Sequence, residues 1–169
     1  AGALPHATPP RQRREGTWTV AVATARTGLP NMRGAPRQGS LAPALTARVE
    51  LDVSLVAGDA LEGLQGFSHA WVVFAFSRNS NENVVERWRR GEATHFPAKV
   101  RPPRMGGAKL GVFATRTPHR PNPIGLSLVR VVSVDVKAGV LVVAGSDLCD
   151  ATPVLDVKPF VPADVPADE

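Results

Sequence analysis

The chain has 169 residues, of which 43% are apolar and 21% charged, and its net charge is +5. This is the length and composition of one ordinary globular domain, with enough chain to bury a core without disulfides or metals. The single cysteine excludes an intramolecular disulfide and a cysteine-rich zinc site. The longest apolar runs, 70–76 and 140–144, are far shorter than the roughly 20 residues of a membrane-spanning helix.

Two parts of the chain differ in composition. Residues 1–15 are rich in proline and arginine and contain little that could be buried, so we expect a flexible tail there. We expect residues 16–169 to form a single domain. Because no apolar signal-peptide core is evident near the first residue, we expect a cytoplasmic protein, with an organelle as the alternative.

Alternating or continuous apolar runs predict six or seven strands along the domain. In chain order they cover 17–24, 49–55, 68–77, 110–114, a stretch from Ile124 that includes 126–136, then 140–146 and 153–157. Gly139 stands between two of these strands, where a tight hairpin turn needs glycine.

Helical signals are few. Residues 58–66 predict one helical turn with Leu61 and Leu64 facing inward, and residues 81–90 predict the one convincing helix. The stretch 28–43 is a long loop with three prolines and three glycines, and loops of this length are often binding loops. Short strands joined by long Pro/Gly-rich loops favour an all-β fold, and a closed barrel avoids open edges.

Positive charge is concentrated in one stretch. Residues 78–120 carry ten Lys or Arg and three Glu, whereas 134–169 carry two Lys and seven Asp or Glu. Arginine outnumbers lysine sixteen to four, and its planar fork binds phosphate and stacks on bases. The basic stretch with its interleaved aromatic residues therefore fits a surface that faces nucleic acid, and a solvated basic face is the alternative.

The familiar motifs of nucleotide-binding folds, zinc peptidases and serine hydrolases are absent: there is no Walker A loop, GxGxxG, HExxH or GxSxG. The four histidines lack metal-ligand spacing, so we expect no metal. Cys149 is interpreted as a small buried residue rather than a nucleophile. The candidate functional segments are 36–39 (PRQG), 115–127 (TRTPHRPNPIGLS) and 146–160 (SDLCDATPVLDVKPF). The second is stiff, and stiffness reduces the entropy lost on binding.

The last two segments resemble the signature stretches of the TsaA-like (TrmO-type) family of S-adenosylmethionine-dependent tRNA methyltransferases. The similar stretches are GVFATRTPHRPNPIGLS and DLCDATPVLDVKPFVPAD, and PRQG, LEGLQGFSHAWVVFAF and AKVRPPRMGG match in the family's order. The resemblance covers roughly 17–164. It implies a single-sheet β-barrel, a homodimer, and methylation of N6 of threonylcarbamoyl-adenosine at tRNA position 37, next to the anticodon.

The resemblance also implies which residues contact S-adenosylmethionine. They would be Pro36, Arg37, Gln38, Phe76, Ser77, Arg116, Leu126, Asp150, Ala151, Thr152 and Pro153. Two positions depart from the family: Ala151 replaces the glycine of a D-G-T-P turn, and Phe160 replaces a tyrosine. Alanine is strained at this turn if the backbone there needs a positive φ.

Methyl transfer to a carbamoylated N6 requires loss of the N6 proton, which a carboxylate could accept. Asp147 is the candidate, with Asp156 as a second one. Arg120 or Lys158 could stabilise the negative charge that develops on the carbamoyl oxygen. Phosphates of the tRNA anticodon stem-loop could be contacted by Arg101, Arg104, Lys109 and Arg120.

Three other functions stay open at this point. The chain could be a non-catalytic RNA-binding barrel, an idea that the departures at Ala151 and Phe160 keep open. It could also methylate a small metabolite or a protein, against which the basic stretch counts. A purely structural barrel would leave the Arg, Asn and Asp side chains of the two signature segments unexplained.

Overall fold

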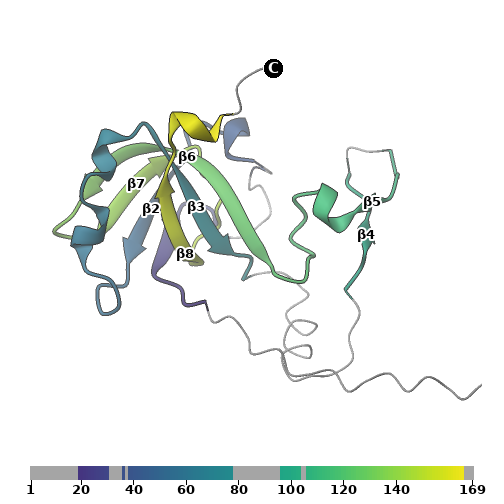
Figure 1. Ribbon diagram of the computed structural model, residues 1–169, viewed down its shortest axis with the longest axis horizontal. Coiled ribbons are helices and arrows are strands. Elements are labelled where there is room, and N and C mark those ends of the chain that lie inside the picture. Colours follow the sequence, from purple (N-terminus) through teal and green to yellow (C-terminus); the bar gives the residue numbers. More distant parts are fainter. Residues whose placement is uncertain (1–18, 31–35, 37, 78–95, 104–105, 166–169) are drawn as a thin grey trace, which may run out of the picture.

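A closed barrel of six antiparallel strands dominates the computed structural model, which describes residues 19–30, 36, 38–77, 96–103 and 106–165 (Figure 1). The strand order around the barrel is β1-β2-β7-β6-β3-β8, and pairing of β8 with β1 closes it. The strands are β1 (Ala23–Thr27), β2 (Thr46–Leu51), β3 (His69–Ala75), β6 (Ile124–Asp135), β7 (Val140–Ala144) and β8 (Thr152–Pro159). The predicted all-β, single-sheet barrel is therefore confirmed.

The barrel interior is filled by alternate side chains of the strands. In β3, for example, Ala70, Val72 and Phe74 are buried while the residues between them are partly exposed. A strand places successive side chains on opposite faces, so period-two alternation makes one face apolar and one face solvated. The largest fully buried side chains come from five strands and one connection: Leu141, Leu148, Val49, Val72, Val129, Val143 and Val154.

One end of this barrel, which we call the mouth, is where β1, β3 and β7 end and β2, β6 and β8 begin. The rim residues there are Thr27, Thr46, Ala75, Ile124, Ala144 and Thr152. The β6–β7 hairpin turn lies at the opposite end, and Gly139 adopts a φ of 65° in it, as predicted. The one helical turn predicted at 58–66 is two 3-10 turns, η2 (Gly58–Leu61) and η3 (Leu64–Gly66), and Leu61 and Leu64 are buried as predicted.

A small two-stranded sheet lies beside the barrel and leads into β6 (Figure 1). Its strands are β4 (Lys99–Val100) and β5 (Leu110–Gly111), and a 3-10 turn, η4 (Val112–Ala114), follows. We call residues 96–103 and 106–114 the arm and residues 115–123 the hook. Among the described residues, no helix is long and apolar enough to cross a lipid bilayer.

Some predicted boundaries were wrong. The strand expected at 49–55 ends at Leu51, and Val53 and Leu55 are 65% and 57% exposed. The Asp52 side chain ends it by accepting hydrogen bonds from the backbone N–H and the hydroxyl of Ser54, an Asx-type turn. The strand expected at 110–114 becomes 3-10 after Gly111, and β4 was not predicted. The helix predicted at 81–90 lies outside the described residues, as do 1–15 and residues 17 and 18 of the first predicted strand.

The PRQG loop between β1 and β2 is held against the end of β7. The carbonyl of Leu45 accepts hydrogen bonds from the N–H groups of Gly145 and Ser146, at 2.9 and 3.3 Å. Gly39 is buried at this contact, and a Cβ built on it would overlap the carbonyl oxygen of Gly145. Because the obstacle is backbone rather than a flexible side chain, the loop can stay in place only with glycine at position 39.

We therefore expect Gly39→Ala to lower the free energy of unfolding by about 1–3 kcal/mol, because overpacking forces the backbone to shift. Urea denaturation measures the change. Gly66→Ala is the matched control, since a Cβ there meets nothing within 4 Å. An unchanged unfolding midpoint for Gly39→Ala would contradict this close approach.

Candidate functional site

The mouth opens into a cavity of about 1600 Å³ that the predicted segments line together. The PRQG loop, the end of β3, the start of β6, the hook and the arm all contribute lining residues. The β7–β8 connection adds Asp147, Leu148 and Cys149. Segments from residue 36 to residue 152 thus meet at one place, and the PRQG loop, the hook and the β7–β8 connection each adjoin a strand end at the mouth.

Asp147 is the carboxylate of the cavity. The Ser127 hydroxyl, which lies on β6, donates a 2.5 Å hydrogen bond to Asp147 Oδ1. Burial raises the pKa of Asp147 above its ordinary 3.8, and the Ser127 hydrogen bond and the nearby Arg116 charge offset only part of this effect. A carboxyl with a raised pKa inside a cavity is suited to proton transfer near neutral pH.

The hook is stiffened by its own hydrogen bonds as well as by its prolines. The Thr115 and Thr117 hydroxyls accept hydrogen bonds from the backbone N–H groups two residues later, those of Thr117 and His119. Arg120 Nη1 donates to the Thr115 carbonyl at 3.3 Å, and its guanidinium lies 5.9 Å from the Phe113 ring centre. The hook therefore presents Arg116 and Arg120 to the cavity from a fixed backbone.

Most residues predicted to contact a methyl donor lie in this cavity. The lining includes Pro36, Gln38, Phe76, Ser77, Arg116, Leu126 and Thr152. Three others, Asp150, Ala151 and Pro153, do not line it, and Arg37 lies outside the described residues.

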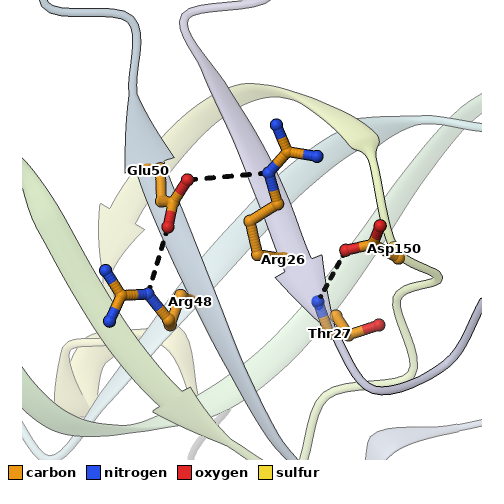
Figure 2. A network of polar contacts seen from close by, with 5 residues as sticks. All are labelled: Arg26, Thr27, Arg48, Glu50 and Asp150. Atoms are coloured by element: carbon orange, nitrogen blue, oxygen red, sulfur yellow. Dashed lines mark hydrogen bonds and ion pairs between the residues drawn. The ribbon is translucent and has the colours of Figure 1, made fainter.

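Asp150 has a different place from Asp147, although only two residues separate them. Its Oδ1 accepts a 3.0 Å hydrogen bond from the N–H of Thr27 at the end of β1 (Figure 2). The backbone N–H groups of Asp150 and Ala151 donate to the carbonyls of Leu29 and Ala25. These contacts fasten the turn before β8 to β1.

The predicted catalytic residues separate into two places. Asp147 and Arg120 both line the cavity. Lys158 lies instead on β8, where its exposed ammonium pairs with Asp156 at 2.6 Å, and neither residue lines the cavity. Arg120, and not Lys158, therefore lies in the same cavity as the Asp147 carboxylate.

The predicted phosphate contacts are also divided. Arg101 and Arg120 line the cavity, from the arm and the hook respectively. Lys109 is exposed on the arm but does not line the cavity, and Arg104 lies outside the described residues, as do Arg87, Arg89 and Arg90.

The cavity also includes residues that the sequence analysis did not single out. His69 and Arg130 are cross-strand partners of β3 and β6, and His119 lies in the hook. Of these three residues, only His119 lies in one of the three candidate functional segments that were chosen from the sequence. Cys149, interpreted from sequence as buried, is half-buried and lines the cavity. Within the described ranges, no three His, Cys, Asp or Glu side chains gather as a metal site.

Comparison with known proteins identifies a matching domain family and relatives longer than this chain. Residues 24–165 match the tRNA-methyltransferase O N-terminal domain. The tRNA (adenine(37)-N6)-methyltransferase of Escherichia coli is 42% identical over 130 residues, which are 75% of this chain and 50% of that protein. The mouse protein of the same name is 40% identical over 130 residues, which are 76% of this chain and 27% of that protein.

A Pseudomonas aeruginosa protein named as a candidate S-adenosylmethionine-dependent methyltransferase is 45% identical over 135 residues, 79% of this chain and 50% of that protein. The crystal structure of TrmO from the same organism superposes with a TM-score of 0.69 at 37% identity, covering 91% of this chain and 60% of that one. The chain thus spans about half the length, or less, of the curated relatives described here. On the match over 24–165 and these identities, the chain belongs to the tRNA-methyltransferase O N-terminal domain family.

Proposed function

We propose that this chain transfers the methyl group of S-adenosylmethionine to N6 of adenosine 37 in tRNA. The observation that carries the proposal is one cavity that holds the Asp147 carboxyl, whose pKa is raised, together with Arg116 and Thr152. The E. coli and mouse relatives are named for this reaction, and the P. aeruginosa relative is named for this methyl donor.

The cavity fits a donor of this kind. Its volume of about 1600 Å³ exceeds the roughly 300–1,000 Å³ of a typical small-molecule site, which leaves room for an acceptor base beside the donor. Phe76, Leu126 and Leu148 offer apolar contacts for the adenine ring and the carbon chain. Gln38, Arg116 and Thr152 supply polar groups for the ribose hydroxyls and the carboxylate.

When bound, S-adenosylmethionine supplies a methyl group that is electrophilic because it is attached to a sulfonium. The remaining task of the protein is to orient the acceptor nitrogen, exclude water and remove a proton. Asp147 takes the N6 proton in our proposal, and the Ser127 hydroxyl holds the carboxylate in position. Arg120 stabilises the negative charge that develops on a carbonyl attached to N6.

The finer details of the proposal concern the acceptor and the assembly. We propose that the acceptor is threonylcarbamoyl-adenosine in the anticodon stem-loop, because a carbamoyl-substituted nitrogen has a more acidic proton that Asp147 can remove.

We also propose a cytoplasmic homodimer. The homodimer is what the family resemblance implies.

The acceptor is tested by methyl transfer from labelled S-adenosylmethionine to bulk tRNA, followed by mass spectrometry of the nucleosides. The tRNA comes from normal cells and from cells that lack threonylcarbamoylation. We expect label in N6-methyl-threonylcarbamoyl-adenosine, and only with the modified tRNA. Donor binding without label would point to another acceptor, and a chain that binds tRNA but neither binds nor uses the donor would be a non-catalytic RNA-binding barrel.

Asp147→Asn is expected to lower the methyl-transfer rate roughly 10²- to 10⁴-fold, because the general base is lost. The folded state holds the Asp147 proton more tightly than the unfolded chain does, so stability falls as the pH rises from the unfolded pKa through the raised folded pKa. At neutral pH the variant should therefore be as stable as the wild type or more stable, as urea denaturation measures.

The control for Asp147→Asn is Asp59→Asn, which removes an exposed carboxylate on η2 (Gly58–Leu61). The wild-type rate should also decline as the pH falls through the raised pKa of Asp147. If Asp147→Asn methylates tRNA at the wild-type rate, Asp147 is not the general base.

Arg116→Ala is expected to weaken binding of S-adenosylmethionine roughly 10- to 100-fold, the effect of losing a charge-assisted hydrogen bond. Isothermal titration calorimetry measures the change. Lys137→Ala removes an exposed charge in the hairpin turn at the far end of the barrel and should bind the donor normally. Equal affinities for Arg116→Ala and the wild type would exclude a donor contact by Arg116.

A further inference from the structure

Two arginines share one glutamate on the outer wall of β1 and β2 (Figure 2). Arg26 and Arg48 are directly opposite each other in the β1–β2 pairing. Arg26 Nε lies 3.6 Å from Glu50 Oε2, and Arg48 Nε lies 3.1 Å from Glu50 Oε1. We call Arg26 and Arg48 the arginine pair. Glu50 thus pairs with both guanidinium groups on the same face of the sheet.

The arginine pair keeps most of its hydrogen-bonding capacity. Both contacts to Glu50 use Nε, and within the described part of the chain the terminal nitrogens of the two guanidinium groups make no hydrogen bond or ion pair. The side chains are 51% and 58% exposed. Two positive charges face one negative charge, so the cluster as a whole attracts anions. Exposed ion pairs of this kind add little to stability.

The wall beside the arginine pair is hollowed. A depression of about 320 Å³ is lined by both arginines together with Thr27 and Thr46. Thr27 is the last residue of β1 and Thr46 the first residue of β2, so the depression lies at the rim of the mouth. An anion bound there would adjoin the entrance of the large cavity.

The strand order places this depression across the barrel from the other arginines of the site. In the ring β1-β2-β7-β6-β3-β8, β1 lies opposite β6 and β2 lies opposite β3. Arg116 and Arg120 come from the hook, which leads directly into β6, and Arg101 comes from the arm. A nucleotide whose base enters the mouth therefore has positive charge on both sides of its backbone.

We propose that the arginine pair binds a backbone phosphate of the tRNA on the β1–β2 side of the mouth, as a second anchor opposite the hook. This inference rests on the proposed function, since it takes tRNA as the substrate. Two guanidinium forks can hold one phosphodiester in bidentate fashion, which lysines could not do. The contact would fix the orientation of the RNA without reading its sequence.

The test compares the wild type with Arg26→Ala/Arg48→Ala in fluorescence anisotropy titrations of purified tRNA over a range of salt concentrations. We expect the double variant to bind tRNA roughly tenfold more weakly, with a salt slope lower by roughly one unit per lost phosphate contact. In the methylation assay, KM for tRNA should rise about as much while kcat at saturating tRNA stays unchanged. The Kd for S-adenosylmethionine should also stay unchanged.

Lys137→Ala is the control for charge alone, because it removes an exposed cation at the far end of the barrel. Thermal melting of each variant verifies that the barrel is folded. If the double variant Arg26→Ala/Arg48→Ala binds and methylates tRNA like the wild type, or no worse than Lys137→Ala, the proposed phosphate contact of the arginine pair is wrong. The proposed function would still stand. A wild-type chain that binds S-adenosylmethionine but no tRNA would overturn both.

Discussion

Closure of the barrel by β8 against β1 is the constraint on which the site depends. The pairing aligns Ala25 with Thr152, and the Thr27 N–H reaches the Asp150 carboxylate across 123 residues of chain. Contacts between such distant residues carry a large loop-closure entropy, which only the completed barrel offsets. Because of this closure, the PRQG loop after β1 and the connection before β8 line the same cavity.

The buried carboxyl of Asp147, at the mouth of the barrel, lowers the stability of the folded state at neutral pH. Asp147 would be more stable ionised in water than in this cavity, which is why burial raises its pKa. The Ser127 hydrogen bond limits the cost without removing it, and it also holds the carboxylate toward the cavity. Natural proteins tolerate such groups where the chemistry requires them. The surrounding barrel must therefore supply the stability that the site lacks.

The sequence predicted the barrel because its strands alternate regularly and because Gly139 stands where a hairpin turn requires glycine. It did not predict the end of β2, because an Asp52 turn overrides alternation that continues to residue 55. It named Asp147 ahead of Asp156 as the proton acceptor, but only the fold shows that Asp147 lines the cavity whereas Asp150 and Asp156 do not. The arginine pair was not predicted for a related reason. Which residues face each other across two strands depends on the register of the strands, and the sequence alone does not determine that register.

Neither of the two departures from the family's pattern lies in the lining of the cavity. Ala151 has a φ of 59°, and it is the one non-glycine residue with a positive φ among the described residues. Alanine pays roughly 1–2 kcal/mol for that conformation, yet its N–H still bonds the Ala25 carbonyl and Thr152 still faces the cavity. Phe160 packs edge-on against His69 and Trp71 and does not line the cavity. A missing glycine and a missing hydroxyl at these places therefore give no reason to expect a degenerate donor site.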